Sequence, residues 1–176
     1  FSISGCVEHN ETTNLVNKYS SEFHSKSHSL NNIINNQYTP QSIIKKKKFE
    51  QSHIVLARRI PGIKSSDRFS LALINNMLGD GMSSRLHQQI REKKGMAYNI
   101  YSTIQFLSDC GAFYIYAATN HKQLSNTEKL IKEEMLKMIN SKITNTELLK
   151  VKEQLKSSLI ISLENMSSNM QSQAKT

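Results

Sequence analysis

The feature that most limits how this chain can fold is a pair of strand-like runs joined by a very short link. The runs cover residues 97–107 and 111–119, and they are rich in the β-branched and aromatic residues that favour strands. Only Ser108-Asp109-Cys110 separates them. A link this short indicates an antiparallel hairpin. We therefore predict an antiparallel sheet at the centre of the fold.

The segment before the hairpin predicts one strand and two helices. Phe49–Ala57 carries a run of apolar residues typical of a strand. Asp67 can cap a helix with a buried stripe, and Ser83 or Ser84 can cap a second, short helix. Gly95 ends that short helix and lets the chain turn into the hairpin.

Two long amphipathic helices are predicted after the hairpin. Apolar residues recur at helical spacing from Leu124 to Met138, and again from Leu148 to Leu159. The second helix opens with Thr144-Asn-Thr-Glu147, a pattern typical of a capping box. The predicted order is β-α-α-β-β-α-α. This order corresponds to an α+β fold in which helices pack on an antiparallel sheet.

The composition of the chain changes along its length. Phe1–Gly5 has the character of the end of a buried strand, so we expect the chain to begin within a larger protein. An amphipathic helix follows, up to about residue 24. Residues 25–48 are rich in Ser, Asn, Gln and Lys without a sustained period, which indicates a linker. Residues 49–176 hold the predicted α+β domain. Beyond Asn165 the chain turns polar, and we expect a frayed or truncated end there.

The positive charge of the chain is concentrated in one place. The formal net charge is +9, and the run Lys45–Lys48 carries four positive charges. Such a run is usually a solvated linker or edge. Nucleic-acid binding through it is an alternative, but no aromatic residues are interleaved with the lysines and no RNA- or DNA-binding module is recognisable. No stretch has the apolar length that spans a bilayer. We expect neither a nucleic-acid partner nor a membrane span.

The six histidines do not form a recognisable metal motif. His24 and His28 have the separation that places two imidazoles on one helix face, but a zinc peptidase helix also needs a glutamate beside them. Two imidazoles alone are too few ligands for zinc. Cys6 and Cys110 belong to no CxxC pattern. We expect this chain to bind no metal.

Residues 78–98 contain the best candidates for binding chemistry. One helix ends at glycines, and a short helix follows whose last turn carries Arg91. Gly95 then lets the chain reverse into a strand that starts near Tyr98. A guanidinium and a phenol at one end of a sheet can both donate hydrogen bonds to a peptide carbonyl or an oxyanion. The residues alone leave open a structural alternative, in which Arg91 pairs with a carboxylate and Tyr98 packs in the sheet.

The same stretch resembles a known family. Residues 78–86, Leu-Gly-Asp-Gly-Met-Ser-Ser-Arg-Leu, are similar to the signature LGGGMSSRLF of the pitrilysin/insulinase family of zinc metallopeptidases, which includes bacterial and mitochondrial processing peptidases. Residues 91–98 are similar to the family's stretch R-E-K-R-G-L-A-Y. Residues 51–54 resemble the strand that enters its second domain, and residues 154–165 resemble its final helix.

The resemblance implies a function for each part of the chain. Residues 49–176 would be the substrate-binding, non-catalytic half of a zinc peptidase, and residues 1–24 the closing strand and helix of a mostly missing catalytic domain. That other half, or a paired subunit, would hold the zinc. This chain would have no catalytic residue and would bind the peptide or protein substrate with Arg91 and Tyr98. The alternative is a non-catalytic partner or core subunit that binds peptides or scaffolds a complex. The compartment implied is the bacterial cytoplasm or the mitochondrial matrix.

Two departures from the family pattern bear on these expectations. Asp80 stands where the family usually has a glycine, which can alter that loop. The family's inverted zinc motif, His-x-x-Glu-His, is absent from the chain, as is its downstream glutamate ligand. In active members both lie in the preceding domain.

Overall fold

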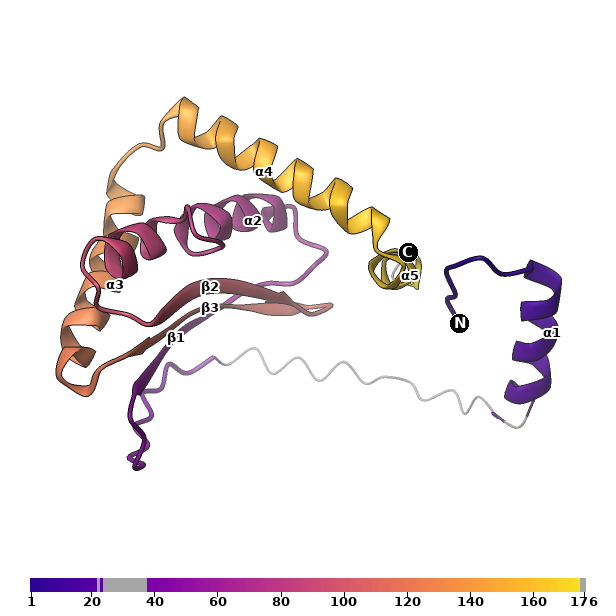
Figure 1. Ribbon diagram of the computed structural model, residues 1–176, viewed down its shortest axis with the longest axis horizontal. Coiled ribbons are helices and arrows are strands. Elements are labelled where there is room, and N and C mark those ends of the chain that lie inside the picture. The colour runs from indigo at the N-terminus through magenta and orange to yellow at the C-terminus, as the bar shows by residue number, and fades with distance from the viewer. Residues whose placement is uncertain (22, 24–37, 175–176) are drawn as a thin grey trace. The chain divides into compact units, whose positions relative to one another are not determined.

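The computed structural model describes residues 1–21, 23 and 38–174. The chain divides into two compact units. One comprises residues 35–155, and the other comprises residues 1–34 together with residues 156–176. The first unit contains the sheet and is the larger of the two (Figure 1).

An antiparallel sheet of three strands forms the centre of the larger unit. Its strands are β1 (Ser52–Pro61), β2 (Asn99–Phe106) and β3 (Cys110–Thr119), in the order β1-β3-β2. β2 and β3 form the predicted hairpin, with Phe106 opposite Gly111 at its closed end. β1 lies at the other side of β3, where Ser52 is opposite Thr119. The structure thus confirms the hairpin and the antiparallel sheet.

Helices complete the α+β fold that the sequence predicts. In chain order they are α2 (Asp67–Leu78), the π-helix η1 (His87–Glu92), the 3-10 helix η2 (His121–Gln123), α3 (Leu124–Asn140) and α4 (Asn145–Glu164). The predicted order of one strand, two helices, two strands and two helices is therefore observed, with η2 as an additional turn before α3.

The core lies between the sheet and these helices. Ile54, Ile100 and Ile115 project from the three strands into it, one from each strand. Leu86 and Ile90 enter from the loop and π-helix before β2, and Ile131 enters from α3. Leu86, Ile90, Ile115 and Ile131 are completely buried. Because side chains alternate across a strand, the opposite face of the sheet carries the intervening residues.

That opposite face carries a row of aromatic rings across the three strands. Nδ1 of His53 on β1 and the hydroxyl of Tyr116 on β3 form a hydrogen bond of 2.8 Å. The rings of Tyr116 and of Tyr101 on β2 lie 5.1 Å apart. Phe49 meets His53 edge-on just before β1 begins. This row crosses all three strands and supports the observed register.

The first strand is displaced from its predicted position. The prediction places it at 49–57, whereas β1 covers Ser52–Pro61 and ends on a proline. A proline cannot donate to a ladder hydrogen bond, but β1 pairs only with β3 and is an edge strand, where a proline is tolerated.

Helix capping differs in part from the expectation. Asp67 does not cap α2 but is its first residue, and its backbone N–H donates to the Ser65 hydroxyl over 3.2 Å. Before α4, the Thr144 hydroxyl accepts the predicted capping bond from the Glu147 N–H, also over 3.2 Å. The Glu147 carboxylate, by contrast, binds Arg85.

The smaller unit contains α1 (His9–Ser20), as the amphipathic pattern predicts, and α5 (Met166–Ala174). The predicted strand at Phe1–Gly5 is absent, because a strand needs a partner and this unit provides only helices. The frayed end expected after Asn165 is also wrong. The Asn165 side chain accepts a hydrogen bond from the Ser168 N–H over 3.1 Å and caps α5.

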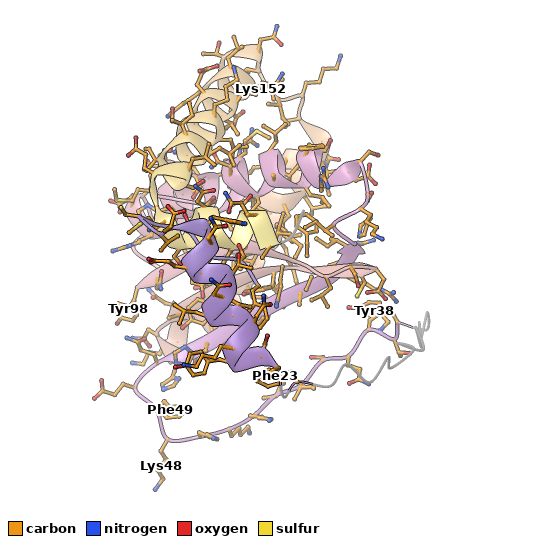
Figure 2. The ribbon with its side chains drawn as sticks, turned by 90° about the vertical axis from the view of Figure 1, so that its right-hand side faces the viewer. Phe23, Tyr38, Lys48, Phe49, Tyr98 and Lys152 are labelled. Atoms are coloured by element: carbon orange, nitrogen blue, oxygen red, sulfur yellow. The ribbon has the colours of Figure 1, made fainter. Side chains whose placement is uncertain are left out.

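The predicted linker is described only from residue 38 onward. Residues 38–48 contain neither helix nor strand and are exposed, and Lys48 and Phe49, labelled in Figure 2, shortly precede β1. His24 and His28 lie outside the described residues. The domain limits at 24, 48 and 176 remain a prediction. Within the described ranges, no helix combines the length and the apolarity that a membrane crossing requires.

Candidate functional site

The glycine-containing loop after α2 is fixed against the sheet. The Gly79 carbonyl accepts a hydrogen bond from the Ser102 N–H of β2 over 3.1 Å, and a Cβ atom on Gly79 would overlap Ser102. Gly81 has φ of +92°, a conformation that favours glycine. Asp80 between them has no positive φ and is exposed, so the backbone accommodates an aspartate where the related signature has glycine.

Arg85 joins this loop to α4. Its Nε and Nη2 atoms donate to the two carboxylate oxygens of Glu147 over 2.9 and 2.7 Å. These hydrogen bonds, assisted by the positive charge of Arg85, hold the pKa of Glu147 below its usual value, although partial burial opposes the effect. The same hydrogen bonds raise the pKa of Arg85. The Arg85 guanidinium therefore has a structural role, and we do not assign it to ligand binding.

Arg91 lies in the last turn of η1, as the sequence predicts. In this π-helix the Lys93 N–H donates to the Gln88 carbonyl, five residues back, over 3.1 Å. Such a widened turn is frequent at functional sites. Arg91 is exposed, and its Nη1 atom lies 3.1 Å from Nε2 of His87. Within the described part of the chain it makes no ion pair with a carboxylate.

Tyr98 lies immediately before β2 and is anchored only through its backbone. Its N–H donates to the Ala118 carbonyl of β3 over 2.9 Å. The residue is 59% exposed, and its side chain is labelled in Figure 2. Among the described residues its hydroxyl has no hydrogen-bond partner. The structural alternative required Tyr98 to pack in the sheet, and its exposed side chain does not do so.

A short connection, exposed from residue 92 to residue 95, joins Arg91 to Tyr98. Gly95, with φ of +60°, donates its N–H to the Arg91 carbonyl over 3.0 Å and reverses the chain. The next residue, Met96, donates to the Ile90 carbonyl over 3.0 Å, and its own carbonyl accepts a hydrogen bond from the buried Thr119 hydroxyl. Through these hydrogen bonds the backbone that follows Arg91 is fixed to the end of the sheet where β2 begins and β3 finishes, next to Tyr98. No hydrogen bond joins the Arg91 and Tyr98 side chains to each other in the described structure.

The family model of the peptidase M16 inactive domain matches residues 1–155 of this chain. The chain belongs to this family. The match confirms the resemblance to pitrilysin/insulinase-type zinc metallopeptidases, and it identifies the chain as the non-catalytic type of M16 domain.

Relatives and solved structures agree with this assignment. The chain is 36% identical over 139 residues to zinc protease YmxG of Bacillus subtilis, which covers 79% of this chain and 34% of that protein. A zinc protease of Rickettsia felis is 33% identical over 164 residues, covering 93% of the chain and 39% of that protein. An M16 inactive domain from Pseudomonas fluorescens superposes with a TM-score of 0.57 and 28% identity over 62% of this chain and 27% of that one. A protease from Helicobacter pylori shares the fold, with a TM-score of 0.74 at 23% identity over 94% of this chain and 41% of that one.

The M16 chain thus spans little more than a third of the length of these zinc proteases. Its own side chains offer no zinc site in the described ranges, since no three His, Cys, Asp or Glu residues there gather closely enough to hold a metal ion. The residues present therefore do not fit a zinc ion. The expectation that the whole chain binds none remains a prediction.

One residue of this site was not identified from the sequence. It is His87, which contacts Arg91 and has only 7% of its surface exposed. The spacing of four residues between the two could have suggested the contact, because residues at this separation share a helix face.

Proposed function

We propose that this M16 domain is the substrate-binding, non-catalytic half of a zinc-dependent endopeptidase that processes peptides or proteins. The observation that supports the proposal is the exposure of Arg91 and Tyr98 on either side of the short connection from η1 to β2. Both residues are exposed. In the described structure Arg91 forms no ion pair with a carboxylate, and the Tyr98 hydroxyl has no hydrogen-bond partner. Two exposed polar groups on a rigid scaffold, with hydrogen-bond donors still free to bind a ligand, are typical of a binding site.

The chemistry of the pair suits a peptide backbone. A guanidinium has five N–H donors and no acceptor, and a phenol has one O–H donor. A peptide that crosses this end of the sheet presents carbonyl oxygens, which can accept from both groups. Negative charge develops on the attacked carbonyl oxygen during peptide hydrolysis, and donors aimed at that oxygen stabilise the transition state. Arg91 and Tyr98 would therefore contribute to both binding and turnover.

The proposal requires a second half that supplies the remaining chemistry. The relatives are named zinc proteases and are much longer than this chain. We propose that the zinc ion and the general base belong to that other half, or to a paired subunit. The bound metal would polarise the scissile carbonyl. The residues of this chain would hold the peptide across from it.

Photo-crosslinking of a peptide to the chain tests the proposal. A peptide with a central benzoylphenylalanine would be irradiated with the 176-residue chain, and the crosslinked residues would be mapped by mass spectrometry. We expect crosslinks within residues 91–101, reduced severalfold by Arg91→Ala. Arg58→Ala is the matched control, because it removes an exposed guanidinium from β1 instead.

The distribution of crosslinks separates the alternatives. Crosslinks that cluster at Lys45–Lys48 would contradict the proposed site and favour charge-driven binding. Crosslinking that is weak and unchanged by Arg91→Ala would favour the alternative of a non-catalytic scaffold or core subunit.

A further inference from the structure

We propose that His87 is a positioning residue, whose neutral imidazole orients the Arg91 guanidinium for the peptide substrate. The inference rests on the proposed function of Arg91 and adds a residue to that site. His87 does not contact the substrate in this account. It acts through Arg91.

The geometry of η1 places the imidazole directly beneath the guanidinium. His87 begins the π-helix and Arg91 lies four residues later, so the two side chains share one face. Nε2 of His87 lies 3.1 Å from Nη1 of Arg91. The His87 side chain is 9% exposed, whereas Arg91 is exposed. The histidine thus forms a buried base and the arginine extends from it toward solvent.

The chemistry of the contact fixes the state of the ring. A guanidinium can only donate hydrogen bonds, so Nε2 must be the acceptor. The proton of the neutral ring is therefore on Nδ1. A doubly protonated ring would place two cationic donors against each other at this distance, and the contact would be lost. His87 consequently supports Arg91 only as the Nδ1–H tautomer.

The other ring nitrogen carries an energetic cost. Nδ1 is buried and has no hydrogen-bond partner in the described structure. Its nearest carboxylate oxygen, Oε1 of Glu92, is 3.7 Å away on a side chain that is 54% exposed. A buried donor without a partner is unfavourable, and each case needs an explanation. Support of Arg91 provides one.

An apolar residue would fill this position without the penalty. Phenylalanine, for example, has a ring with no polar atom to leave unpaired. A phenyl ring buries well but cannot accept a hydrogen bond from Arg91. In this chain the guanidinium is restrained at one nitrogen, and its remaining N–H groups are left to bind carbonyl oxygens. A restrained side chain loses less conformational entropy on binding than a free one.

A set of four variants tests the inference by peptide binding. Binding of a fluorescein-labelled β-casein fragment to the 176-residue chain would be measured by fluorescence anisotropy, because the chain contains no tryptophan of its own to report binding. The variants are His87→Phe, His87→Gln, Arg91→Ala and the double variant His87→Phe/Arg91→Ala. We expect Arg91→Ala to raise Kd about tenfold or more, and His87→Phe about threefold to tenfold. His87→Gln keeps a carbonyl acceptor and should stay within about twofold of the wild type.

The double variant and the melting temperature separate positioning from a structural role. Positioning predicts that His87→Phe has no further effect once Arg91 is alanine, and that the Tm of His87→Phe equals or exceeds that of the wild type. If His87→Phe weakens binding equally in both backgrounds, or leaves Kd unchanged while Arg91→Ala raises it, the inference is wrong and the proposed function stands. If Arg91→Ala itself leaves Kd unchanged, both are wrong.

Discussion

At the scale of single residues, the loop after α2 depends on a glycine with no room for a side chain. A Cβ atom on Gly79 would overlap the backbone and side chain of Ser102. We expect Gly79→Ala to lower the free energy of unfolding by about 1–3 kcal/mol, the usual range for overpacking. Asp80→Ala is the matched control, because Asp80 is exposed and should change stability by less than about 0.5 kcal/mol. Chemical denaturation of both variants measures the difference, and equal effects would refute the close contact.

The ion pair between Arg85 and Glu147 should make stability depend on pH. Because the pKa of Glu147 is lower in the folded chain than its usual value of 4.5, the folded state favours the ionised carboxylate. The stabilisation is therefore present above pH 4.5 and is lost as the pH falls through the lower, folded-state pKa. We expect Glu147→Gln to cost about 1–2 kcal/mol at pH 7.

Urea denaturation of the wild type and of Glu147→Gln between pH 3 and pH 7 would check this dependence. The difference between them should shrink as the carboxylate of the wild type becomes protonated. A difference that stays constant over this range would show that Glu147 contributes through packing and not through its charge.

At the scale of helices and strands, the sheet predicts a pattern of hydrogen exchange. β3 is paired on both sides, whereas β1 and β2 are edge strands. In an antiparallel edge strand only alternate N–H groups meet the neighbouring strand. We expect nearly uniform slow exchange along β3 and alternating slow and fast exchange along β1. Exchange followed by NMR would reveal the pattern, and uniform protection along β1 would mean that another strand covers this edge.

The elements that the sequence predicts correctly are those whose determinants are local. The hairpin follows from two strand-like runs and a three-residue link, and the α4 cap follows from Thr144. The failures depend on partners distant in sequence. The extended character of Phe1–Gly5 could not reveal whether a neighbouring strand exists, and the shift of β1 to Ser52–Pro61 is set by its pairing with β3.

The site shows the same division. The glycines and the helical spacing predicted that Arg91 lies in the last turn of a short helix and that a strand starts near Tyr98. The contact between Arg91 and His87 depends on the burial of the imidazole ring and on the widened turn of η1. Neither feature can be predicted from the sequence alone. The use of Glu147 as a partner of Arg85 likewise joins residues 62 positions apart.

At the scale of the whole molecule, the metal content of the isolated chain directly tests whether the zinc ion belongs to the other half of the peptidase. The described residues offer no metal cluster, and His24 and His28 supply too few ligands. We expect much less than one zinc ion per chain after dialysis, measured by elemental analysis. One tightly bound zinc ion per chain would contradict the assignment of the metal to the other half.

The central claim is that this M16 domain binds the substrate of a peptidase through Arg91 and Tyr98. Peptide hydrolysis by the chain combined with its zinc-binding half tests it most directly. Tyr98→Phe removes one hydroxyl, and we predict that kcat falls by roughly 10²–10³, the usual effect of losing one oxyanion donor, while the Tm and zinc content stay unchanged. Arg91→Ala should also raise KM, because a positioning contact exists in the ground state as well. Wild-type kcat and KM in both variants would contradict the claim.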